Sequence, residues 1–180
     1  IKACLIKGLP ALYADVCNAV RVSDPTQAGM KVVVKHHGTF RAHSLVVTAK
    51  AFLQEQISSL RNTDRFTGDD PSSASQPPTA LLWALFLKCH LHEASGEMEE
   101  ALVYINECLA HTPTATDFFL KKAQILKHMG DLSTAASVAD EGRALDLQDR
   151  YLNNKPTKYF LRADNPKSAA ENMSLFARYE

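Results

Sequence analysis

The 180-residue sequence has no excess charge of either sign and no long apolar run. Its 20 basic and 20 acidic residues balance, so bulk attraction to nucleic acid or membranes is not expected, although a local patch is still compatible with that total. No stretch approaches the roughly 20 apolar residues of a membrane span, and no charged segment precedes a short apolar one as in a signal peptide. We therefore expect a soluble, cytoplasmic, globular protein without membrane partners.

Cysteine is scarce, and its spacing excludes the common metal and redox motifs. The four residues, Cys4, Cys17, Cys89 and Cys108, form no C-x-x-C pair. Two of them fall in helical apolar stripes, which is typical of reduced core residues in a cytosolic protein. We expect buried thiols rather than disulfides.

Catalytic and metal-binding motifs are also missing. There is no phosphate-binding loop, no G-x-S-x-G turn and no glycine-rich turn after a strand. His90 and His92 lie two residues apart, so they point about 200° away from each other on a helix and cannot share one ion. The paired carboxylates Glu99-Glu100 and Asp140-Glu141 lack apolar surroundings that would shift a pKa. We expect no catalytic residues, no metal site and no enzyme activity.

What the sequence does contain is a repeat. Gly96, Gly130 and Asp164 are spaced by 34 residues, and so are Ala101, Ala135 and Ala169. This period is the length of the tetratricopeptide repeat, a helix-turn-helix unit whose copies stack into a right-handed solenoid. Small residues are needed where the helices cross, which predicts buried side chains at Cys89, Ala101, Ala123 and Ala135. The predicted fold is an all-α tetratricopeptide solenoid.

Turn signals place the repeat boundaries. The copies are predicted over residues 79–113, 114–149 and 150–180, the last one truncated, giving two and a half repeats with five consecutive antiparallel helices. Gly96 and Gly130 suit the left-handed position after a helix, Pro113 closes the second helix of the first copy, and Asn165-Pro166 indicates a helix start. Gly142 stands where alanine is usual, which predicts a slightly loosened helix. The start at Ile1 and the stop within a repeat suggest a segment of a longer protein whose apolar ends favour self-association.

Residues 61–78 are polar and rich in Pro, Ser and Asp, which predicts a linker or mobile loop. Before it, residues 1–60 contain two stretches with helical spacing of apolar residues, from Leu9 to Val20 and from Leu45 to Leu60, and we expect a helical pair. The β-branched stretch 29–38 is compatible with a strand, a helix extension or an inserted loop.

Charge separates along the repeats. From Phe118 to Gly130 and from Arg150 to Ala163 there are basic residues and no acids, whereas 131–149 carries five acids and one arginine. First helices of such repeats line a concave groove, so this pattern predicts positive potential there. The candidate anion or partner site comprises Lys121, Lys122, Lys127, His128, Lys155, Lys158, Tyr159 and Arg162, with Lys121 and His128 at the rim and Tyr159 as a hydroxyl donor. The alternative is a solvated basic face. A nucleic-acid groove is disfavoured by zero net charge and few aromatics.

Several phrases resemble a known family. "PPTALLWALFLKCH", "EEALVYINECLAHTPTATDFFLKKAQILKHMGD", "ADEGRALDLQDRYLNNKPTKYFLRAD" and the weaker "IKGLPALYADV" are similar to the central part of the auxiliary, ribosome-anchoring subunit of the N-terminal acetyltransferase A (NatA) complex. The likeness covers nearly all of residues 77–170. Residues 29–41 look like an insertion relative to that family.

The resemblance implies a non-catalytic helical scaffold that wraps the acetyltransferase subunit and docks it to ribosomes. It also implies that acetyl-CoA binds the catalytic subunit, whose R/Q-x-x-G-x-G/A loop is absent here. Family members hold inositol hexakisphosphate in a basic pocket between the subunits, and the matching residues are Lys122, Lys127, Lys155, Lys158 and Tyr159, with Gln124 in place of another lysine. The alternative function is a generic tetratricopeptide adaptor that clamps acidic peptide tails, as co-chaperones do.

Overall fold

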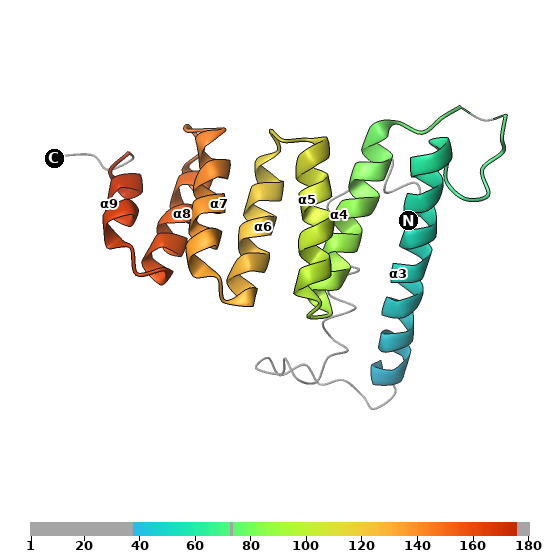
Figure 1. Cartoon of the computed structure of the whole chain (residues 1–180), viewed down its shortest axis with the longest axis horizontal. Helices are drawn as coiled ribbons and strands as arrows, with labels where there is room; N and C mark the ends of the chain where they lie inside the picture. Colours follow the sequence, from blue (N-terminus) through green and yellow to red (C-terminus); the bar gives the residue numbers. More distant parts are fainter. Residues whose placement is uncertain (1–37, 73, 176–180) are drawn as a thin grey trace. The chain divides into compact units, whose positions relative to one another are not determined.

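The described part of the chain, residues 38–72 and 74–175 of a computed structural model, is all-helical (Figure 1). Its helices are α3 (Gly38–Thr63), α4 (Pro78–Ala94), α5 (Met98–His111), α6 (Thr116–Met129), α7 (Leu132–Ala144), α8 (Arg150–Arg162) and α9 (Pro166–Ser174). They pack in consecutive pairs, which confirms the predicted all-helical repeat fold. None of the helices within these residues is long and apolar enough to cross a membrane.

The chain divides into two compact units, and the boundary lies inside α5. The first unit contains α3, α4 and the beginning of α5 up to Tyr104; the second begins at Ile105 and contains α6 to α9. Within the second unit α7 packs on α6 and α8, and α8 packs on α9. Figure 1 shows these four helices alternating in direction.

The 34-residue period is visible in the backbone of three turns. Gly96, Gly130 and Asp164 all have positive φ angles, of 80°, 89° and 54°. The next amide in each turn donates to a carbonyl five residues back: Glu97 to His92 at 2.9 Å, Asp131 to Leu126 at 3.0 Å and Asn165 to Phe160 at 2.9 Å. This is the 6→1 hydrogen bond of the Schellman motif, which satisfies a carbonyl that the helix end leaves open. The repeat in sequence is therefore a repeat in hydrogen bonding.

Each turn also starts the next helix in the same way. The amides of Ala101, Ala135 and Ala169 donate to the carbonyls of Glu97, Asp131 and Asn165 at 3.1, 3.1 and 3.3 Å. The side chains of Asp131 and Asn165 accept from the amides of Thr134 and Ser168, as N-caps do. Asn165 followed by Pro166 thus begins α9, as predicted.

The small residues at the predicted helix crossings are buried. Cys89, Ala101, Ala123 and Ala135 have no exposed surface, which confirms the prediction for all four. In the third copy Thr157 takes the position that Cys89 and Ala123 take in the first two. Its hydroxyl donates to the Asn153 carbonyl within the same helix at 3.1 Å. A hydroxyl turned back onto its own backbone is compatible with a close helix approach.

The expected number of helices was wrong. Residues 78–175 form six helices instead of five, because α9 completes a third pair. The helix expected over 45–60 extends over Gly38–Thr63, so residues 38–41 are helical. The other expectations for residues 1–37, the helix from Leu9 to Val20 and the stretch 29–37, lie outside the described residues.

Two hydrogen bonds hold the polar segment between α3 and α4. Phe66 is buried, and the amide of Thr67 donates to the side-chain oxygen of Gln56 on α3 at 3.0 Å. Further along, the amide of Gln76 donates to the carbonyl of Asp64 at 2.7 Å, which draws the two ends of the loop together. Since α3 and α4 also pack on each other, this loop does not separate two units.

Candidate anion and partner interface

The first of the two basic helices, α6, is built to place cations at its end. Asp117 lies in its first turn and Lys127 and His128 in its last, so each charge opposes the end of the helix dipole beside it. The helix stops at Gly130, which takes the left-handed conformation. Nothing lies within 4 Å of where a Cβ would be at Gly130, so glycine is used there for its backbone freedom alone.

The second basic helix, α8, is held at its start by two polar side chains. The carboxylate of Asp149 accepts from the amides of Tyr151 at 2.7 Å and Leu152 at 3.3 Å. The side-chain Nδ2 of Asn153 donates to the carbonyls of Leu147 at 3.2 Å and Asp149 at 2.9 Å, tying the α7–α8 connection to the helix. Pro156 interrupts the helical ladder because it has no amide hydrogen to donate.

The eight predicted site residues all lie on these two helices, and both helices pack against α7. His128, Lys158 and Arg162 are exposed, and Lys122, Lys127 and Lys155 are half-buried. Lys121 and Tyr159 are buried, with 9% and 8% of their surface exposed. Six of the eight side chains are therefore at least partly open to solvent.

Their interactions differ. The ammonium of Lys155 lies 4.8 Å above the ring of Tyr151, and that of Lys121 is 3.4 Å from the side-chain oxygen of Gln124. Lys121, Lys127, His128 and Tyr159 have further interactions within the molecule. For Lys122, Lys158 and Arg162, the salt bridges among the described residues include no carboxylate partner. These three cations are the ones most open to a partner from outside.

Lys121, which the sequence interpretation placed at the rim of the basic site, is a buried side chain. It is one repeat after Leu87, which is 1% exposed, so it takes an inward-facing position of the repeat. A long side chain can bury its methylene stem in such a position while its ammonium reaches toward polar atoms. Comparing the copies residue by residue would have shown this, because Leu87 and Lys121 are 34 apart.

The acidic stretch is less uniform than the sequence indicated. Helix α7 ends at Ala144, so Asp131 and Asp149 cap helices instead of lying on the acidic one. Hydrogen bonds from Thr134 hold the pKa of Asp131 below its usual value. Asp140 on α7 accepts from Arg143 at 2.6 Å and from the amide of Asn172 on α9 at 3.2 Å. The carboxylates thus organise helix starts and a helix contact.

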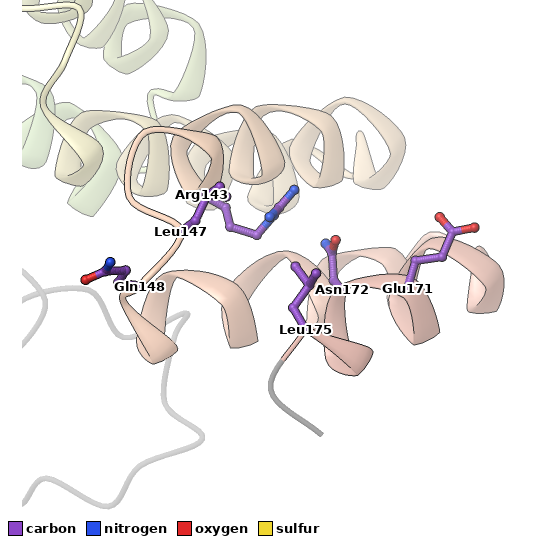
Figure 2. A pocket seen from close by; sticks show the side chains of 6 residues that line it. All are labelled: Arg143, Leu147, Gln148, Glu171, Asn172 and Leu175. Atoms are coloured by element: carbon purple, nitrogen blue, oxygen red, sulfur yellow. The ribbon is translucent and has the colours of Figure 1, made fainter. Parts of the chain in front are cut away.

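A pocket of about 650 Å³ opens between the end of α7, the α7–α8 connection and α9 (Figure 2). Its lining residues are Arg143, Leu147, Gln148, Glu171, Asn172 and Leu175. Figure 2 shows Asn172 of α9 and Leu175, the residue after this helix, pointing toward α7. The lining includes no Cys, Ser, Thr or His, and it shares no residue with the predicted basic site.

The two histidines of α4 and the cysteines of α4 and α5 are used in packing. His90 packs edge-on against Phe86 at 4.6 Å between ring centroids, whereas His92 stacks on Tyr104. Cys89 and Cys108 are buried free thiols, and burial raises the pKa of Cys108 to about 12. Within the described residues no group of three potential ligands is close enough to hold a metal ion.

Paired helices joined by a repeated turn define a helical-repeat fold. The sequence model of the N-terminal acetyltransferase A auxiliary subunit matches residues 37–180, and the chain belongs to this family of non-catalytic subunits. It is 35% identical over 178 residues to the NatA complex auxiliary subunit NAA15 of Arabidopsis thaliana, covering 99% of this chain and 17% of that protein. It is 41% identical over 120 residues to the human NatA auxiliary subunit N-alpha-acetyltransferase 16, covering 67% and 14%.

The fold is similar to a solved structure from the same family. The structure of Naa15/Naa10 bound to HypK-THB aligns with a TM-score of 0.69 and 28% sequence identity, covering 99% of this chain and 23% of the matched one. The chain thus spans less than a quarter of the length of the relatives it matches.

Proposed function

We propose that this chain is part of a scaffold that binds the catalytic acetyltransferase subunit, with the α6 and α8 cations as a contact for negative charge. Membership of the auxiliary-subunit family is the observation that carries the proposal. The solved relative contains Naa15 together with Naa10, which supports a role in holding a catalytic partner. In the full-length protein the same scaffold would dock the enzyme to ribosomes for acetylation of emerging chains.

The basic helices suit either a polyphosphate or an acidic protein surface. Lys158 and Arg162 are exposed and Lys122 is half-buried, and none of the three makes a salt bridge to a described residue. Charge-assisted hydrogen bonds to phosphate are strong, and the guanidinium of Arg162 can make a bidentate contact. Inositol hexakisphosphate is the polyphosphate that we propose, with Lys127, Lys155 and Tyr159 completing the site. The proposal needs no cofactor for chemistry, since the role is structural.

Capture of the catalytic subunit tests this function. Full-length protein should recover the acetyltransferase from lysate, and Lys158→Glu together with Arg162→Glu should weaken the recovery. Recovery of chaperone tails instead would favour the second candidate, an adaptor for acidic peptides, whose support is the same basic face.

A thermal-shift measurement tests the polyphosphate. Inositol hexakisphosphate should raise the unfolding temperature of the complex, because a ligand that binds only the folded state stabilises it by mass action. The glutamate variants should lose this shift, and rising salt should reduce it through screening. Equal shifts in parent and variants would mean that the basic face is only solvated surface.

A further inference from the structure

A cluster of charged and aromatic side chains joins α3 to the α4–α5 hairpin within the first unit. Lys50 on α3 donates to Glu97 in the α4–α5 turn at 2.7 Å. The same carboxylate oxygen lies 2.5 Å from Nδ1 of His92 on α4. The side chains of Lys50 and His92 are only 15% and 11% exposed, while that of Glu97 is 45% exposed. The Glu97 carboxylate thus links α3 and α4 through the largely buried side chains of Lys50 and His92.

Neighbouring contacts hold the imidazole in place. Its ring stacks on that of Tyr104 on α5, with centroids 5.2 Å apart and an angle of 24°. The ammonium of Lys88, itself 4% exposed, lies 4.9 Å from the same Tyr104 ring and donates to Gln54 of α3. Tyr104 also donates to Gln54 at 3.3 Å. Glu93, next to His92 in sequence, is buried and has interactions of its own.

This geometry fixes the tautomer of His92. A carboxylate can only accept, so Nδ1 carries the hydrogen and donates it to Glu97. Nε2 is then unprotonated, and this buried nitrogen makes no hydrogen bond to the described residues. A second proton would create a buried N–H donor without an acceptor there, which costs the desolvation of that group.

The surrounding charges also oppose the second proton. Burial is the main cause that lowers the pKa of His92; Lys50 and Lys88 lower it further, while the hydrogen bond and charge of Glu97 act in the opposite direction. For Glu97, partial burial raises the pKa, but the hydrogen bonds from Lys50 and His92 outweigh it and leave the pKa below its usual value. At neutral pH the cluster therefore holds a neutral imidazole, a carboxylate and two ammonium groups.

We propose that the Lys50–Glu97–His92 cluster is an acid-sensitive latch that keeps α3 on the α4–α5 hairpin while the imidazole is neutral. When the imidazole takes up its second proton, the buried position becomes unfavourable, and the ring leaves Tyr104 and Glu97 for solvent. Opening releases Glu97 from one of its two donors and loosens the turn that begins α5.

The direction of the pH effect follows from proton uptake. A histidine with a lowered pKa in the closed form binds more protons when open, so the closed form is fully stabilised above the ordinary histidine pKa of about 6.5. Stability is lost as pH falls through the lower pKa of the closed form. One proton changes the opening constant by at most about tenfold per pH unit.

Two measurements test the latch in the 180-residue chain. Nuclear magnetic resonance titration should show His92 titrating below the ordinary histidine range, and Lys50→Gln should move this titration upward because it removes a nearby positive charge. Hydrogen exchange at the Ser95 and Glu97 amides, corrected for intrinsic rates, should report turn opening that increases from pH 7 to pH 5.

Matched variants separate the latch from ordinary packing. His92→Asn keeps a donor for Glu97 but does not titrate, so its turn opening should be independent of pH. His90→Asn removes a histidine that packs on Phe86 instead and should keep the parent profile. The latch is wrong if His92 titrates at or above about 6.5, the ordinary histidine value, or if the asparagine variant at 92 keeps the parent's pH dependence. Should that variant fail to fold, the titration of the parent decides.

Discussion

Helices α4 and α8 occupy the same position in the first and third repeats, yet their surroundings differ. Eleven of the seventeen residues of α4 are buried, including Lys88, His92 and Glu93. Only five of the thirteen residues of α8 are buried, and Lys158 and Arg162 are exposed. Both helices are followed by the same left-handed turn. The turn therefore sets the repeat geometry, while the side chains on each helix decide how much of it is buried.

The largest effect should come from filling a helix crossing that all copies share. Ala135→Leu adds three carbons where no surface is exposed, and we expect it to lower the free energy of unfolding by about 3 kcal/mol. Urea denaturation followed by circular dichroism measures this. Ala144→Leu, at an exposed position of the same helix, is the control and should have little effect. Equal loss in both variants would show that the small-residue register is not what holds α6 and α7 together.

A somewhat smaller effect is expected at Gly142, which distinguishes α7 from α5. A Cβ there would lie 2.6 Å from the Cβ of Phe119 on α6. Alanine normally favours a helix over glycine, but this contact forces the helices apart, so Gly142→Ala should destabilise by about 2 kcal/mol. Gly142→Ala should cost less in a Phe119→Gly background, because the Cβ at position 119 is then absent. Stabilisation by the single variant would restore the interpretation of Gly142 as a loosened helix position.

The smallest effect concerns the left-handed turn that follows the first helix of each repeat. Gly130→Ala should cost about 1 kcal/mol, because a side chain disfavours the left-handed conformation even where space is free. Asp164→Gly should act in the opposite direction, since it relieves a non-glycine residue at φ 54°. Thermal unfolding measures whether each variant raises or lowers the unfolding temperature. Changes of the same sign in the two variants would mean that the turns are not equivalent.

These turns are the part that could be predicted from sequence, because their physics is local. Glycine or aspartate in a left-handed position, a cap one residue later and a small residue four further on all lie within a short stretch. The spacing of 34 then identifies the repeat without any knowledge of distant contacts. The same register predicted four buried side chains, and the structure confirms them: Cys89, Ala101, Ala123 and Ala135.

What could not be predicted depends on contacts between segments far apart in sequence. Lys50 and Glu97 are 47 residues apart, and no local pattern indicates that a lysine of α3 meets a carboxylate of the α4–α5 turn. The role of Gly142 depends on Phe119 of the neighbouring helix. The sequence showed the basic residues as a charge pattern. The burial of Lys121 and the capping roles of Asp131 and Asp149 became known only from the positions of the helices in the structure.

The most direct test compares two charge reversals of equal size in the full-length protein. Lys158 is exposed on α8, and Lys167 is exposed in the first turn of α9, outside the proposed interface. Affinity for the catalytic acetyltransferase subunit, measured by titration calorimetry with inositol hexakisphosphate present, should fall at least about tenfold for Lys158→Glu, equivalent to 1.4 kcal/mol. Lys167→Glu should leave the affinity unchanged. Equal affinities for parent and Lys158→Glu, or equal losses in both variants, would contradict a binding role for the basic face of α8.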